Sequence, residues 1–152
     1  MNDSRMAAGV RVGVVAAATT IGAVIGLGLR HGLATRPFMT AGYAVLETLG
    51  ARAASRGATP VAVGVSVVAA AIIVLGVCFT FVAASLRGFR LVLAAFLFAA
   101  SAWAVYVYIV PSILAPSDGL ELGTGQRVFL FTLLALALAV GMRLARRNVR
   151  VE

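Results

Sequence analysis

The sequence predicts an all-α, polytopic integral membrane protein. Four apolar runs contain no Lys, Arg, Asp, Glu or His, and runs of about 18 or more such residues are typical of transmembrane helices. Composition agrees, because 62% of the 152 residues are hydrophobic and 12% are charged, whereas a soluble domain carries about 25% charged residues. The four runs are Val12–Leu29, Val61–Leu86, Leu91–Val110 and Val128–Met142. They predict four transmembrane helices.

The four runs leave little chain for anything else, so we expect one membrane domain covering residues 1–152. A further amphipathic helix is expected between the first and second transmembrane helices. The expected bounds are about 10–29, 60–86, 91–110 and 125–143 for the transmembrane helices, and about 37–54 for the amphipathic helix.

The first apolar run is expected to stay as a transmembrane helix. Arg5 and Arg11 precede it, as in a signal peptide, and the segment 32–34 resembles a small-residue cleavage site. The run is, however, longer than the 7–15 apolar residues that are typical of signal peptides. Arg30 and His31 also lie just before the cleavage-like segment. Cleavage is therefore the weaker alternative.

The segment after the first run predicts an amphipathic helix that lies in the membrane interface or packs over the ends of the transmembrane helices. Pro37 suits the first turn of a helix, and Thr35 suits the cap before it. At 100° per residue, Thr40 and Glu47 fall opposite an apolar arc. That arc comprises Phe38, Gly42, Val45, Leu46, Leu49 and Ala53. The alternative is a short fifth span over Pro37–Ala51, which would bury Glu47 at a cost of a few kcal/mol.

The connections also carry structural information. Pro60 suits the first turn of the second transmembrane helix. The tight segment Arg87-Gly88-Phe89-Arg90 predicts that the second and third helices are antiparallel neighbours. The segment 111–126 has loop composition. The fourth apolar run is short, but Arg127 and Arg143 can extend along their own stems to reach water.

Arginines predict the orientation. With the N-terminus inside, eight arginines lie inside and five outside, which favours cytoplasmic N- and C-termini in a bacterial inner (plasma) membrane. The acidic, arginine-poor third loop agrees, and the first loop with its four arginines disagrees. The inner set is Arg5, Arg11, Arg87, Arg90, Arg143, Arg146, Arg147 and Arg150; the outer set is Arg30, Arg36, Arg52, Arg56 and Arg127.

Small residues four apart predict close helix packing. In the first run Ala18, Gly22 and Gly26 form such a set, and small residues let helix backbones approach closely in lipid. Packing within this chain is the first expectation, and packing against another subunit is the alternative. The comparable sets are Gly9, Gly13 and Ala17 in the first run, and Ala62, Ser66, Ala70 and then Gly76, Thr80, Ala84 in the second.

Site chemistry is sparse. Hydroxyl groups within the apolar runs can bond to their own helix, and no ionisable group lies there, which argues against a proton- or ion-coupled transporter. His31 and Cys78 alone make neither a zinc site nor a bis-histidine haem site; Cys78 is expected to be a small buried apolar residue. Asp118 and Glu121 lack a neighbouring base or nucleophile. We therefore expect no catalytic residue, metal or cofactor, and no enzyme.

These features predict a non-catalytic integral membrane protein, an accessory or structural subunit of a larger membrane complex. The alternative is a small homo-oligomeric transporter or channel. The expected partners are membrane lipids and either other integral membrane subunits or a second copy of this chain. Glu47, Arg146 and Arg147 are the candidate contacts to a partner or to lipid. Nucleic acid is not expected despite the net charge of +8, because the arginines flank apolar runs.

Overall fold

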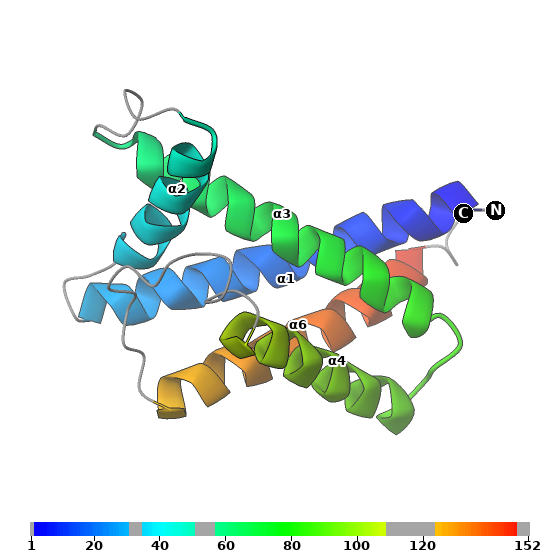
Figure 1. Ribbon diagram of the computed structural model, residues 1–152. Helices are drawn as coiled ribbons and strands as arrows, with labels where there is room; N and C mark the ends of the chain where they lie inside the picture. The colour runs from blue at the N-terminus through cyan, green and yellow to red at the C-terminus, as the bar shows by residue number, and fades with distance from the viewer. Residues whose placement is uncertain (1, 31–34, 51–56, 109–123, 149–152) are drawn as a thin grey trace.

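A computed structural model describes residues 2–30, 35–50, 57–108 and 124–148, and this part of the chain is all-helical (Figure 1). The all-α prediction is therefore confirmed. The helices are α1 (Asn2–Arg30), α2 (Arg36–Thr48), α3 (Thr59–Val82), α4 (Phe89–Tyr108) and α6 (Thr124–Asn148).

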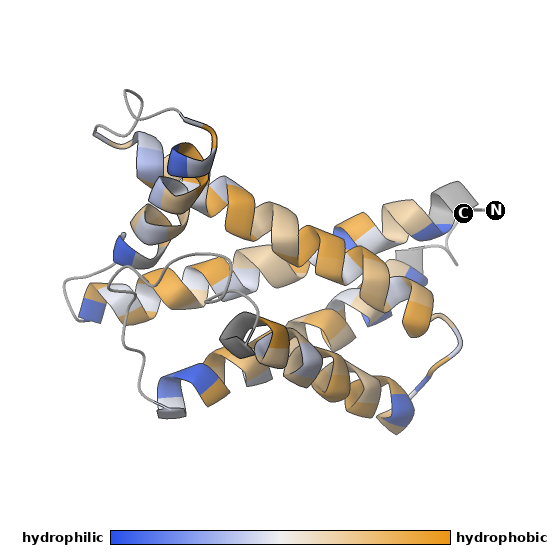
Figure 2. Cartoon of the chain, viewed as in Figure 1, coloured by the Kyte–Doolittle hydropathy of each residue, from blue (hydrophilic) through white to orange (hydrophobic). Residues whose placement is uncertain are grey.

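Three helices are long and apolar enough to cross a membrane: Arg5–Arg30 within α1, Thr59–Val82, and Thr124–Arg146 within α6. The apolar part of α4, Phe89–Val105, is shorter. Figure 2 shows that hydrophobic residues dominate the middles of the long helices, while the most hydrophilic residues lie toward helix ends. The fold is thus compatible with membrane insertion.

Helix ends differ modestly from the expected bounds. The first helix is expected to begin at about residue 10, but α1 is already helical from Asn2. Nothing in its first turns, which include Ala7 and Ala8, interrupts a helix. In contrast, α3 stops at Val82, several residues before the end of its apolar run. The N–H of Ala83 still bonds to the carbonyl of Phe79 at 2.7 Å, and a turn then follows.

The long helices run alternately up and down, so the start of α1 and the end of α6 lie at the same end as the α3–α4 connection (Figure 1). The central element is α1, which packs against both α3 and α6. Its antiparallel pairing with α3 follows from contacts of Gly9 with Val77 and of Gly13 with Ile73. On its other side, Gly141 of α6 approaches Val12.

The prediction that α3 and α4 are antiparallel neighbours holds in part, because the two helices run in opposite directions but do not pack side by side (Figure 1). They touch through Phe79 and Phe98, whose ring centroids are 5.5 Å apart, but α4 packs mainly along α6. Trp103 and Phe131 form a second ring pair between α4 and α6 at 6.0 Å. A tight connection brings only the adjoining helix ends together. Which helix α4 packs against along the rest of its length depends on the side chains on its faces.

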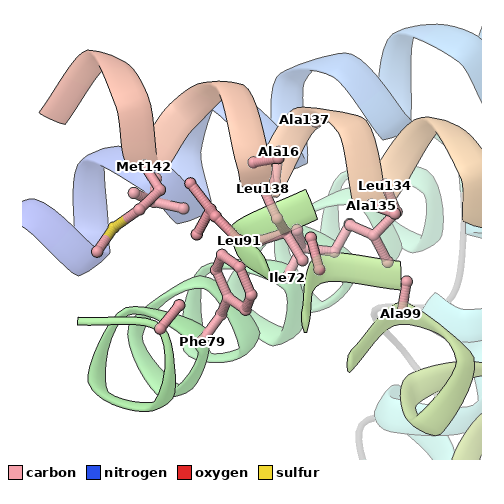
Figure 3. Packing of buried hydrophobic residues seen from close by; sticks show 14 of the residues in the cluster. Ala16, Ile72, Phe79, Leu91, Ala99, Leu134, Ala135, Ala137, Leu138 and Met142 are labelled. Atoms are coloured by element: carbon pink, nitrogen blue, oxygen red, sulfur yellow. The ribbon is translucent and has the colours of Figure 1, made fainter. Parts of the chain in front are cut away.

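The core between these helices is built largely from alanine and leucine (Figure 3). Ala16, Ala95 and Ala135 are fully buried, as are Phe79 and Leu138. Alanine side chains are short, so they let helix axes approach closely while the larger side chains fill the remaining space. The core thus depends on close backbone packing.

Glycines form a close crossing between α1 and α3. A Cβ atom added to Gly13 would lie 2.7 Å from the carbonyl oxygen of Ile73, and one added to Gly76 would lie 2.5 Å from the backbone nitrogen of Gly13. Both separations are too short for real Cβ contacts. These two backbones can approach so closely only because neither position carries a side chain.

The helix predicted after the first apolar run is present as α2, and it packs against the first turns of α3. From the predicted apolar arc, Phe38 and Leu46 are buried, Leu49 is 73% exposed, and Ala53 lies outside the described residues. Thr35 is the residue before the helix, but its side chain makes no cap hydrogen bond. The 13 residues of α2 extend about 20 Å at 1.5 Å per residue, too short for a fifth span.

The contact between α2 and α3 is a reciprocal glycine pair. The position where Gly42 would carry Cβ points at the carbonyl oxygen of Pro60, and the equivalent position of Gly64 points at the carbonyl oxygen of Phe38. The hydrogens of both glycines therefore face carbonyl oxygens, an arrangement that recurs at close helix crossings.

We expect Gly64→Ala to detach α2 from α3, because the new methyl group would overlap the carbonyl of Phe38. Maleimide labelling of a Leu46→Cys reporter, in a Cys78→Ser background, should be slow in the parent and faster in Gly64→Ala. Gly26→Ala is the matched control, since no described atom lies within 4 Å of that position. Equal labelling rates in all three proteins would contradict the crossing.

Candidate functional site

The set Ala18, Gly22 and Gly26 faces outward on α1. All three residues are exposed, and a Cβ added to either glycine would meet no described atom within 4 Å. Among the described residues, none packs against these glycines, so the first expectation, packing within the chain, stays a prediction. The alternative, packing against another subunit, remains open. We call these three residues the open small-residue face.

The other small-residue sets differ in burial. Gly9, Gly13 and Ala17 are buried, as are Gly76 and Thr80, and Gly13 and Gly76 form the α1–α3 crossing. The set Ala62, Ser66 and Ala70 is exposed on α3. Internal packing therefore uses one set from each helix and leaves the other set of each helix outside.

Most hydroxyl groups in the apolar helices are satisfied by their own helix, as expected. Thr19, Ser66, Thr80 and Ser101 each donate a hydrogen bond to the carbonyl four residues earlier, at 2.8–2.9 Å. Only the Thr20 hydroxyl is buried without a partner among the described residues.

Arg146 has an internal role that the sequence did not predict. Its guanidinium donates hydrogen bonds to three carbonyl oxygens of the turn that follows α3: to Leu86 at 2.7 Å, Ala83 at 2.8 Å and Ala84 at 3.0 Å. The C-terminal end of a helix carries partial negative charge, and carbonyls just beyond it lie outside the hydrogen-bond ladder of the helix. A forked cation suits them well. We call this set of contacts the Arg146 clasp.

The remaining candidates are less constrained. Glu47 is exposed on α2. The side chain of Arg147, together with His31, Asp118 and Glu121, lies outside the part that the structure describes.

Cys78 corrects the expectation of a buried residue, because it is exposed on the outer face of α3. A small thiol behaves much as an apolar residue does, so a bilayer would tolerate it there.

Metal chemistry finds no support in residues 2–30, 35–50, 57–108 and 124–148, which contain no group of three His, Cys, Asp or Glu side chains able to hold an ion. The two features with distinctive geometry are the open small-residue face and the Arg146 clasp. The class of protein that the fold supports is an all-helical protein with three helices able to cross a membrane.

Comparisons with protein-family models, with curated proteins and with solved structures each found no match.

Proposed function

We propose that this chain is a four-span integral membrane protein that acts as a non-catalytic accessory or structural subunit of a larger membrane complex. In this arrangement α4 is the fourth span and α2 lies in the membrane interface. Both termini are cytoplasmic in a bacterial inner membrane, because the end that carries them holds most of the arginines.

The open small-residue face is the observation that supports this proposal most. In lipid, helices associate through close packing rather than through the hydrophobic effect, and small residues allow that packing. This chain already uses Gly13 and Gly76 for a close crossing between two of its own helices. A second set of the same kind on α1, left uncovered, suits a helix of another integral membrane subunit.

The chemistry of the apolar runs favours a structural role over transport. The four runs contain no Asp, Glu, Lys, Arg or His, and intramembrane ionisable groups are what usually mark proton and ion pathways. Hydroxyls that bond within their own helix add no such pathway.

Native mass spectrometry of the protein, extracted at native expression level in a mild detergent, tests the proposal. We expect stoichiometric co-purification with larger integral membrane subunits. A homo-oligomer without foreign subunits would overturn the accessory role in favour of the transporter or channel alternative. A lone monomer would overturn both.

Leucine substitutions then locate the interface. We expect Ala18→Leu and Gly22→Leu to lower the co-purified amount by about tenfold, which corresponds to about 1.4 kcal/mol, while the chain itself keeps its melting temperature. Ala100→Leu is the matched control, because Ala100 is an exposed alanine on α4. If Ala18→Leu and Ala100→Leu retain equal amounts of partner, the open small-residue face is not the interface.

A further inference from the structure

Three segments far apart in the chain meet at one end of the molecule. They are the start of α1, the α3–α4 connection and the end of α6, which lie at the same end of the bundle in Figure 1. The Arg146 clasp joins the second and third segments directly, and the approach of Gly141 to Val12 aligns the end of α6 with the start of α1.

This end is rich in arginines. Of the described carboxylate side chains there is only Glu47, which lies on α2 at the opposite end. Asp3 lies in the first turn of α1, and its side chain is outside the described part. Arg87 lies near enough to Arg146 for their like charges to repel. The exposed arginines at this end are Arg5, Arg11, Arg87, Arg90 and Arg143. They outnumber the acidic residues of the described helices there, so this end carries net positive charge next to the apolar helices.

The arginines at this end have different roles. Arg146 donates hydrogen bonds to the carbonyls of Ala83, Ala84 and Leu86, and these bonds hold the α3–α4 connection in place. Arg87 and Arg90 lie on either side of the start of α4 and stay exposed. Their guanidinium groups are therefore available to a ligand.

The surface beside these arginines is apolar. Phe89, between Arg87 and Arg90 in the chain, is 79% exposed. Leu93 and Leu97 follow at helical spacing on α4 and are 49% and 63% exposed. A ligand that fits this surface carries an anionic group at one end and hydrocarbon chains along the helix.

We propose that Arg87 and Arg90 bind the phosphate of an anionic phospholipid, whose acyl chains lie along Phe89, Leu93 and Leu97. Guanidinium groups hold phosphate oxygens by paired, charge-assisted hydrogen bonds, and each basic residue near an anionic leaflet contributes about 1 kcal/mol. This inference rests on the membrane placement in the proposed function, and it adds a lipid site distinct from the open small-residue face.

The lipids that stay bound to the protein after its release from nanodiscs test this site. The full chain is reconstituted in nanodiscs of equal parts phosphatidylglycerol and phosphatidylcholine. It is then released in the mass spectrometer, and the bound lipids of each kind are counted. We expect the wild type to retain phosphatidylglycerol about tenfold more often than phosphatidylcholine. The pair Arg87→Gln/Arg90→Gln should reduce this preference to within twofold.

The matched control is Arg36→Gln/Arg127→Gln, which removes the same charge from exposed arginines at the opposite end. It should keep the wild-type preference. An absent preference in the wild type, or an equal loss in both pairs, overturns the lipid site.

Incorporation into nanodiscs separates this inference from the proposed function. A helical chain that enters nanodiscs but shows no lipid preference overturns the lipid site alone, whereas a chain that does not enter contradicts the membrane placement. If the double variant does not fold, the salt dependence of lipid retention by the wild type tests the arginine contacts instead. Preference for phosphatidylglycerol should fall as screening rises, and a salt-independent preference overturns the arginine contacts.

Discussion

Gly76→Ala is expected to destabilise the protein by about 1–3 kcal/mol, the usual cost of forcing extra volume into a packed core. The added methyl would meet the backbone of Gly13 rather than a movable side chain, so relief requires α1 and α3 to move apart. Because α1 also packs on α6, that movement disturbs the rest of the bundle. Equilibrium unfolding in mixed micelles measures the change.

Gly22→Ala is the control for this result. It is the same substitution in an apolar helix, at a position with no described atom near the new methyl. In a helix interior alanine is favoured over glycine by up to about 1 kcal/mol, so we expect unchanged or slightly higher stability. Equal losses at Gly76 and Gly22 would mean that α1 and α3 do not cross at these glycines.

Arg146→Gln should release the end of α3, with a loss of about 1–3 kcal/mol. Each hydrogen bond to a charged group contributes about 1.5–3 kcal/mol, and partial exposure of the clasp reduces that contribution through solvent screening. Hydrogen exchange at residues 83–88 should accelerate, together with a lower melting temperature in detergent.

Arg143→Gln controls for the loss of charge alone. Arg143 lies three residues before Arg146 on α6 and is exposed, so its replacement should leave exchange in the α3–α4 connection unchanged. Arg146→Lys should be intermediate, because a single ammonium cannot reproduce the fork. Unchanged exchange in Arg146→Gln would contradict the clasp.

Sequence periodicity predicted the helices well for a physical reason. Apolar runs bounded by arginines predict where helices lie. Of the predicted apolar arc on α2, Phe38, Gly42 and Leu46 are buried, whereas Leu49 is 73% exposed. Both signals are local. They depend only on residues within one helix.

Pairing between helices could not be predicted in the same way. The sets containing Gly13 and Gly22 have the same spacing on α1, and only the course of α3 determines which of them is covered. The exposure of Cys78 follows from the same choice of faces.

The clasp of Arg146 on Leu86 joins groups 60 positions apart. Its only signal in the sequence is an arginine near the end of a helix, which is equally typical of membrane orientation. That signal does not indicate which carbonyl groups the arginine binds.

The Arg146 clasp also has a consequence for biogenesis. Synthesis runs from the N-terminus, so α3 emerges from the ribosome well before the arginine that completes its end. Until α6 is inserted, the carbonyls of Ala83, Ala84 and Leu86 lack this donor. The carbonyl of Ala83 keeps the backbone N–H of Leu86 at 3.1 Å, whereas the other two depend on water. Nascent chains arrested before Arg146 should therefore have a frayed end of α3. This end becomes ordered only when α6 is inserted, so insertion of the last helix completes the assembly of the bundle.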